Sequence, residues 1–268
     1  LIFLSTIKVD FNIYKKYREL IKPFMLGLFT CYLFIPLLFF LIGSILIRIN
    51  VINFPLFVGI LITGAVPLAA GSTLVWSKEL GGKVEVTLLL IVTTILASPL
   101  ITPSYIYLFL RDRVTINIQN MFFEMALIIF IPLLASFYFK KKFIKNLNPN
   151  FSFIIIGIII NIAVSKSAEK LDLVKDYLII SIVISLIFIA ITLLVLSLFS
   201  KGLGLKNEEK ESIYMPSFFK NVSLAIIIVS FFEPEVVFFP VIYYIVEQII
   251  PPIYYEIKKY NSEIFKLI

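Results

Sequence analysis

Long apolar runs alternate with short polar loops along the whole chain. About twenty apolar residues are enough for one helical crossing of a bilayer. By that criterion we expect the following spans, the second and the seventh of them interrupted by proline and polar residues: 24–47, 54–76, 84–110, 122–139, 151–165, 177–200, 213–232 and 236–255. The apolar stretch 1–7 predicts the tail of one more helix. The pattern therefore predicts a single all-α polytopic membrane domain over residues 1–268.

Composition and charge give the expected orientation. Hydrophobic residues make up 60% of the chain, and the mean hydropathy is +1.02. Most of the 24 Lys and Arg residues fall in one set of alternating loops, and loops rich in Lys and Arg stay in the cytoplasm. We therefore expect a multi-pass protein of the plasma membrane with a cytoplasmic C-terminus. The net charge of +7 then requires no nucleic-acid partner.

The reactive side chains exclude several classes of function. The sequence contains no histidine, which excludes histidine-based acid–base catalysis and histidine-ligated metal sites within the chain. The single cysteine, Cys31, excludes a disulfide framework. We expect no enzyme activity, no cofactor and no metal site. The lipid bilayer is the expected partner, and the sequence leaves the oligomeric state open.

The interrupted stretch 213–232 carries a lysine at membrane depth. Its first half contains Pro216, Ser217, Lys220, Asn221 and Ser223. A lysine at the bilayer centre costs about 3 kcal/mol on insertion scales, so Lys220 should face protein or a water-filled cavity. The alternative is a side chain that snorkels from near a helix end to the interface. The proline and the polar cluster favour a helix broken at membrane depth beside a binding site.

A second interrupted stretch, 54–76, occupies a comparable position. It lies in the middle of the first three complete spans, as 213–232 lies in the middle of the last three. The first three complete spans and the last three thus form two units. Because each unit has an odd number of spans and two spans lie between the units, the units run through the membrane in opposite directions. We therefore predict an inverted-repeat transporter fold with two broken, crossing helices. The alternative is a pair of kinked helices that satisfy their own backbone and bind nothing.

The ends of broken helices are candidate binding groups. The N–H end carries about half a positive charge and suits an anion, whereas the carbonyl end suits a cation. In the first broken helix we expect the binding backbone at three small residues, since glycine permits a non-helical conformation and hydroxyls can bond freed backbone groups. These residues are Gly71, Ser72 and Thr73.

Several stretches, taken in order, resemble one transporter family. They are 27–36, then 67–73 with 80–87, then 97–103, and finally KNVSLA at 220–225 with PVIYYIVEQ at 240–248. Their order and spacing are similar to the bile acid:sodium symporter family. The resemblance implies ten helices, with a core domain that contains the broken fourth and ninth helices and a panel domain beside it. On that basis the core is 24–110 and 177–256, the panel is 1–7 and 122–165, and the chain begins at the end of the second helix.

Departures from the family pattern affect the expected ion sites. The resemblance implies sodium ligands that include a glutamate and a glutamine in the ninth helix. Pro216 and Lys220 stand at those positions, and only the neighbouring Asn221 is kept. The resemblance places five more residues at polar positions of the family's third, fourth and fifth helices, and two of them, Thr73 and Thr87, keep a hydroxyl. The five are Cys31, Thr73, Leu74, Thr87 and Ile91. Since an ammonium replaces an oxygen ligand and a carboxylate is lost, sodium coupling is disfavoured.

These observations lead to a functional hypothesis. We expect a secondary membrane transporter of organic anions in which Lys220 supplies in cis the positive charge that sodium supplies in relatives. Glu247, in the middle of the last span, would pair with Lys220 or face the cytoplasmic cavity; the alternative is a carboxylate bonded to tyrosine hydroxyls or Gln248 with no transport role. The alternative for the whole protein is a non-transporting membrane receptor or structural relative of the same fold. An intramembrane enzyme is the least favoured class.

Overall fold

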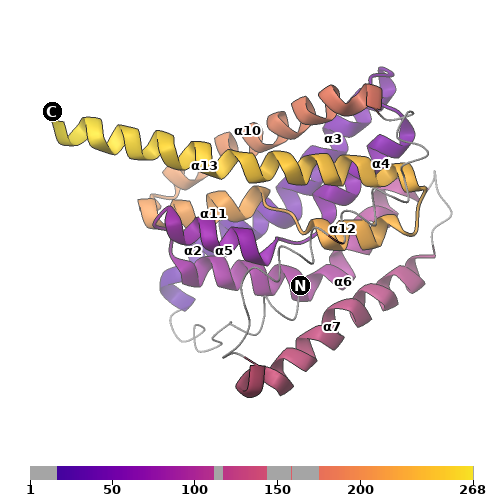
Figure 1. The fold of residues 1–268 in the computed structure, drawn as a ribbon, viewed down its shortest axis with the longest axis horizontal. Coiled ribbons are helices and arrows are strands. Elements are labelled where there is room, and N and C mark those ends of the chain that lie inside the picture. Colours follow the sequence, from indigo (N-terminus) through magenta and orange to yellow (C-terminus); the bar gives the residue numbers. More distant parts are fainter. Residues whose placement is uncertain (1–16, 112–116, 144–157, 159–174, 268) are drawn as a thin grey trace.

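The computed structural model describes residues 17–111, 117–143, 158 and 175–267 (Figure 1). Almost all of these residues are helical. In chain order the elements are α2 (Tyr17–Phe29), the π-helix η2 (Thr30–Phe34), α3 (Ile35–Arg48), α4 (Phe54–Ala65), α5 (Ala70–Glu79), α6 (Val84–Leu110), α7 (Ile118–Phe143), the 3₁₀-helix η5 (Lys175–Tyr177), α10 (Leu178–Gly202), α11 (Asn207–Phe218), α12 (Val222–Val229), the 3₁₀-helix η6 (Pro234–Val237) and α13 (Phe238–Leu267).

The long helices confirm the membrane character of the chain. Within the described residues, four helical segments are long and apolar enough to cross a bilayer: Leu20–Arg48, Val84–Leu110, Leu178–Gly202 and Pro234–Tyr260. Each coincides with a predicted uninterrupted span. Their outer faces expose large apolar side chains such as Leu100, Ile179 and Leu194, as lipid contact requires. The chain is thus an all-α polytopic membrane protein, while the predicted segments 1–7 and 151–165 lie outside the described residues.

Both interrupted spans are broken helices, as predicted, but the first break does not lie where the sequence indicated. In the first, α4 ends at Ala65 and α5 begins at Ala70, so Gly71 is helical and the prediction of a non-helical backbone there was wrong. The physical cause of the break is Pro67. A proline disfavours the helical conformation of the residue before it, and Val66 is accordingly extended, with φ −72° and ψ 153°.

In the second broken helix, the interruption follows Phe218, and Pro216 lies inside α11. The predicted break therefore lies within the polar cluster, between Pro216 and Ser223, although Pro216 itself is helical. A proline inside a helix leaves the carbonyl four residues earlier without its usual donor. That carbonyl belongs to Ser212, and it accepts a hydrogen bond of 3.1 Å from the Thr87 hydroxyl of α6. A neighbouring helix thus supplies the missing donor, and α11 continues past the proline.

The two broken helices cross each other near the middle of the molecule. α5 packs against α11 on one side of the crossing, and α4 packs against α12 on the other (Figure 1). Leu68 and Lys220 form an isolated antiparallel bridge where the two interruptions meet. The predicted architecture of two broken, crossing helices is therefore present.

One end of the bundle is held together by charged residues. Lys83 pairs with Glu209 at 2.8 Å, and Lys258 of α13 pairs with Glu211 at 2.8 Å. Lys258 also donates to the Leu80 carbonyl at 2.8 Å. Burial raises the pKa of the Glu209 carboxyl, but its bonds to Lys83 and to the Lys206 N–H outweigh burial and hold that pKa below its usual value. These contacts join α11 and α13 to the turn between α5 and α6.

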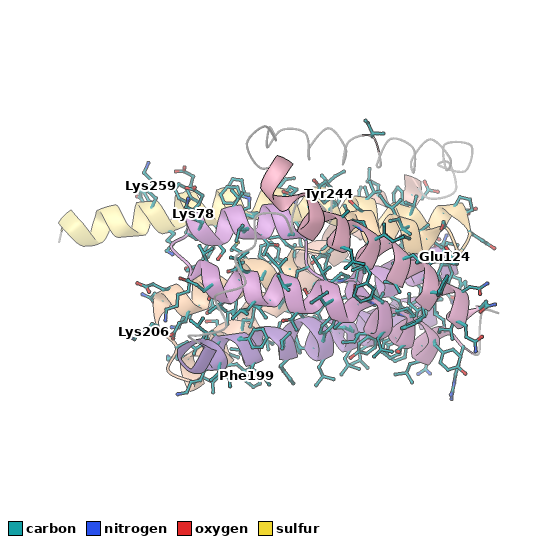
Figure 2. The ribbon with its side chains drawn as sticks, turned by 90° about the horizontal axis from the view of Figure 1, so that it is seen from below. Lys78, Glu124, Phe199, Lys206, Tyr244 and Lys259 are labelled. Carbon is teal, nitrogen blue, oxygen red and sulfur yellow. The ribbon has the colours of Figure 1, made fainter. Side chains whose placement is uncertain are left out.

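Lysines from three separate parts of the chain gather at this same end. Figure 2 shows Lys78, Lys206 and Lys259 together at one end of the molecule and Glu124 toward the other. That arrangement agrees with the alternation of loops on which the orientation was predicted, although which side is cytoplasmic stays a prediction. α7 packs along α6 at the side of the bundle (Figure 1). The division into core and panel also stays a prediction, because most of the remaining panel lies outside the described residues.

A glycine of α4 tests the packing of the crossing helices. A Cβ added at Gly59 would lie 2.6 Å from the Val236 carbonyl oxygen, a backbone atom that cannot swing away. We expect Gly59→Ala to lower the stability of the detergent-solubilised protein by about 1–3 kcal/mol, the usual cost of overpacking, measured by thermal unfolding. Gly202→Ala is the matched control, since an added Cβ there meets nothing within 4 Å. Equal unfolding temperatures for the two variants would contradict the packing of α4 against η6 and α13.

Candidate functional site at the helix crossing

Backbone hydrogen bonds join the two interruptions. The Ala69 N–H donates to the Phe219 carbonyl at 3.1 Å, and the Asn221 N–H donates to the Pro67 carbonyl at 2.9 Å. Each broken helix thereby satisfies backbone groups that the other leaves without helical partners. At membrane depth an unsatisfied backbone group costs several kcal/mol, so each interruption is stable only beside the other.

Lys220 places its ammonium at the carbonyl end of α4. Its side chain is buried, with 2% of the residue exposed, and Nζ donates to the Gly64 carbonyl at 3.2 Å and the Val66 carbonyl at 3.4 Å. The last carbonyls of a helix carry partial negative charge, and a cation there is stabilised. The side chain therefore faces protein and does not snorkel to an interface.

Glu247 meets the same junction from α13. The residue is fully buried, and its Oε2 accepts a 2.8 Å hydrogen bond from the backbone N–H of Lys220. Its Oε1 accepts a longer bond of 3.4 Å from the Gln248 amide. The Tyr243 hydroxyl donates to the Phe218 carbonyl at 2.9 Å. The carboxylate thus lies immediately before α12, near that helix's positive N-terminal end.

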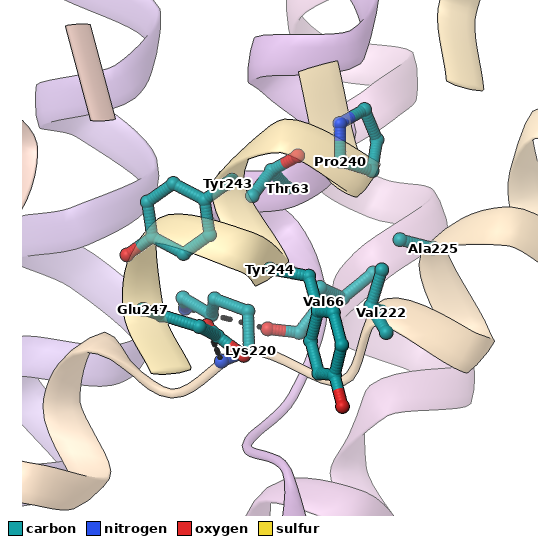
Figure 3. A pocket seen from close by; sticks show the side chains of 9 residues that line it. All are labelled: Thr63, Val66, Lys220, Val222, Ala225, Pro240, Tyr243, Tyr244 and Glu247. Atoms are coloured by element: carbon teal, nitrogen blue, oxygen red, sulfur yellow. Dashed lines mark hydrogen bonds between the residues drawn. The ribbon is translucent and has the colours of Figure 1, made fainter. Parts of the chain in front are cut away.

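A small pocket connects these two charged residues. It is lined by Thr63, Val66, Lys220, Val222, Ala225, Pro240, Tyr243, Tyr244 and Glu247. Figure 3 shows Lys220 and Glu247 side by side, with Tyr243 and Tyr244 of the same helix as Glu247 around them. In this conformation the space between these side chains does not admit a water molecule, so no organic ligand fits there.

The remaining predicted residues of the broken helices border the crossing. Gly71, Ser72 and Thr73 form the first turn of α5, where no side chain caps the helix. The Thr73 hydroxyl is fully buried and has no partner within the described part of the chain. Asn221 caps α12 by accepting a 3.1 Å bond from the Leu224 N–H, and Ser223 is half-buried in the same turn.

Two predicted site residues serve the helices instead of the pocket. The Thr87 hydroxyl contacts Ser77 Oγ at 2.6 Å as well as the Ser212 carbonyl. The Ser217 hydroxyl donates to the Ile213 carbonyl of its own helix. The structure therefore brings Lys220 and Glu247 together and leaves Thr87 and Ser217 outside the pocket.

Sequence reasoning missed three polar residues of the pocket. Thr63 comes from the last turn of α4, and Tyr243 and Tyr244 lie on α13. A signal for the tyrosines was present, because they precede Glu247 by four and three residues and so share its helix face. Thr63 had no comparable signal, since only the crossing brings α4 beside α13.

The fold and the crossing define a class of protein: a polytopic membrane protein built around two broken helices whose ends meet charged side chains at membrane depth, as in secondary transporters. The model of the sodium bile acid symporter family matches residues 1–203. Because the match covers more than half of the chain, the protein belongs to this family of membrane transporters. No curated protein matches the sequence significantly. The matched residues end before α11, so Lys220 and Glu247 lie beyond them.

A double-mutant cycle tests the electrostatic coupling at the crossing. Lys220→Met removes the buried cation of the pocket and leaves the Glu247 carboxylate uncompensated. Because the two side chains are neighbours without a direct ion pair, we expect the cost to stay below the about 3–5 kcal/mol of a broken buried pair. Adding Glu247→Gln removes the uncompensated charge, so the double variant should be more stable than Lys220→Met alone. Thermal unfolding of the four proteins in one detergent provides the measurement. Strictly additive effects would show that the two residues do not interact.

Proposed function

We propose that this protein is a secondary transporter that carries a small organic anion across the plasma membrane without sodium coupling. The observation that supports this most directly is the buried ammonium of Lys220 at the carbonyl end of α4. The carbonyl end of a helix favours a cation. The ammonium of Lys220 occupies this position, which a mobile ion such as sodium could otherwise occupy. The C-terminus is cytoplasmic in this proposal, as the distribution of lysines indicates.

The crossing offers two kinds of group to an anion. A lysine ammonium has three donors, and Lys220 uses two of them on the Gly64 and Val66 carbonyls. The first turn of α5, at the exposed Gly71 and the half-buried Ser72, provides the positive end of a helix with no side-chain cap. A carboxylate or sulfate that reaches both would find a full charge and a set of backbone donors.

The donor set fits sodium poorly. Sodium needs several hard oxygen ligands and a nearby carboxylate to balance its charge. Pro216 carries no such group, and Lys220 already places a positive charge on the carbonyls of α4. Two positive charges about 4 Å apart repel by roughly 4 kcal/mol at an effective dielectric near 20. Lys220 therefore disfavours a sodium ion at this crossing.

The size of the pocket suggests that the structure describes a closed state. Because the closed pocket has no room for an organic anion, binding requires the crossing to open. In transporters with inverted repeats, one group of helices rocks against the other around a fixed site. We propose that movement of a panel that contains α7 against the crossing helices opens this site alternately to each side.

Uptake into liposomes tests this function. We expect the reconstituted protein to accumulate at least one of three labelled probes (taurocholate, oestrone sulfate or 2-oxobutyrate) whether or not a sodium gradient is present. Lys220→Gln should abolish that uptake, because the fixed cation is lost. Lys78→Gln, at an exposed lysine of α5, is the control and should transport as the unmodified protein does.

Two results would overturn the proposal. Uptake that requires a sodium gradient would show that the coupling ion still binds despite Lys220. No uptake of any probe by the unmodified protein would favour the alternative of a non-transporting relative with the same fold.

A further inference from the structure

We propose that Glu247 is the coupling site of this transporter and binds one proton each time an organic anion pairs with Lys220. The inference rests on the proposed function and adds the identity of the coupling ion. It arises from the way one buried cation and one buried carboxylate share a single small pocket.

The empty site holds one charge of each sign. Lys220 and Glu247 line the same pocket and contribute one positive and one negative charge, so the closed pocket is neutral. The ammonium bonds carbonyls of α4 and the carboxylate bonds the Lys220 N–H, so the two charges are neighbours without a direct ion pair. Buried charges are tolerated more readily when a charge of opposite sign lies close by. A monovalent anion that binds the third donor of Lys220 adds a second negative charge. The pocket is then neutral only if Glu247 takes up a proton.

Binding of the anion and of the proton must therefore favour each other. If the anion becomes the counter-charge of Lys220, Glu247 loses its own, and its charged form is destabilised at a fully buried position. By linkage, protonated Glu247 leaves Lys220 free to attract the anion more strongly. The loaded site carries the ammonium, the anion and a neutral carboxyl, which gives one proton for each monovalent anion.

The hydrogen bonds of Glu247 are compatible with both protonation states. Oε2 accepts the backbone N–H of Lys220 at 2.8 Å, a bond that a neutral carboxyl can also accept. Oε1 is held only by the long 3.4 Å bond from the Gln248 amide. A glutamine amide has both a donor and an acceptor. Rotation of that amide presents its oxygen to a proton on Oε1, so the protonated state keeps two partners.

The other elements around Glu247 offer few competing groups. α4 and α12 contain no ionisable residue, and the lysine of α10 lies in that helix's last turn. On α13 itself, the Tyr243 hydroxyl is bonded to the Phe218 carbonyl, and Tyr244 lines the pocket.

Two further ionisable groups lie in neighbouring elements. Glu235 of η6 precedes Glu247 by about three helical turns along the chain. Cys31 of η2 is buried near Lys220. Within the described residues, Glu247 is therefore the acidic side chain that lines the pocket with Lys220.

The test uses the full chain in liposomes with whichever of the three labelled probes it transports. An inward proton gradient should drive accumulation of the probe, and a proton ionophore should abolish that accumulation. Glu247→Gln should lose all stimulation by the gradient and should exchange the probe at a rate independent of pH, because the amide cannot bind or release a proton. Glu79→Gln, at an exposed glutamate of α5, is the matched control and should keep the stimulation.

A second measurement does not require net transport. Adding the probe to detergent-solubilised protein should produce the infrared absorption of a protonated carboxyl, and Glu247→Gln should lack that band. Uptake that occurs but ignores the proton gradient would overturn the proton inference and leave the transport function standing. Absence of uptake and of probe binding would overturn both.

Discussion

The pair of backbone hydrogen bonds at the crossing is the constraint on which the rest of the structure depends. A helix broken at membrane depth exposes N–H and carbonyl groups that lipid cannot satisfy. In this protein the Ala69 N–H reaches the Phe219 carbonyl, and the Asn221 N–H reaches the Pro67 carbonyl. Each interruption is therefore stable only because the other supplies its backbone hydrogen bonds. The helices on either side, α4 against α12 and α5 against α11, follow from that mutual dependence.

The remaining helix ends at the crossing are served by side chains of opposite charge. The ammonium of Lys220 lies against the carbonyl end of α4, and the carboxylate of Glu247 lies just before the N-terminal end of α12. Each charge thus meets the helix end whose partial charge it complements. Because both charges belong to the chain, the closed crossing is electrically satisfied by the protein's own residues. The same two residues line the pocket into which a ligand would enter.

The sequence was informative where exposing a polar or charged group to lipid is costly and the cost can be judged from one stretch of the chain. Apolar runs of sufficient length predicted the four long helices that could cross a bilayer, because a bilayer sets the length of a helix. The cost of a charge at membrane depth predicted that Lys220 faces protein. The sequence was less informative where a distant residue decides the outcome. The polar cluster that includes Pro216 predicted the second break, but not that α11 continues past the proline to Phe218, because the Thr87 hydroxyl of α6 bonds the carbonyl that this proline leaves free. Thr63 became a pocket residue only through the crossing, for which sequence spacing carries no signal.

A fixed cation differs from a mobile one in a way that governs a transport cycle. A mobile ion enters with the substrate, leaves with it, and lets the empty site return in a different charge state. Lys220 cannot leave, so the site carries its positive charge in both the loaded and the empty forms. Any difference in charge between those forms must then come from the substrate and from a group that can gain or lose a proton. Glu247 is such a group in the same pocket, and its full burial makes an uncompensated charge there costly. In the proposed transport cycle, the lysine that stands where the resemblance implies a neutral glutamine therefore favours a proton over sodium as the coupling ion.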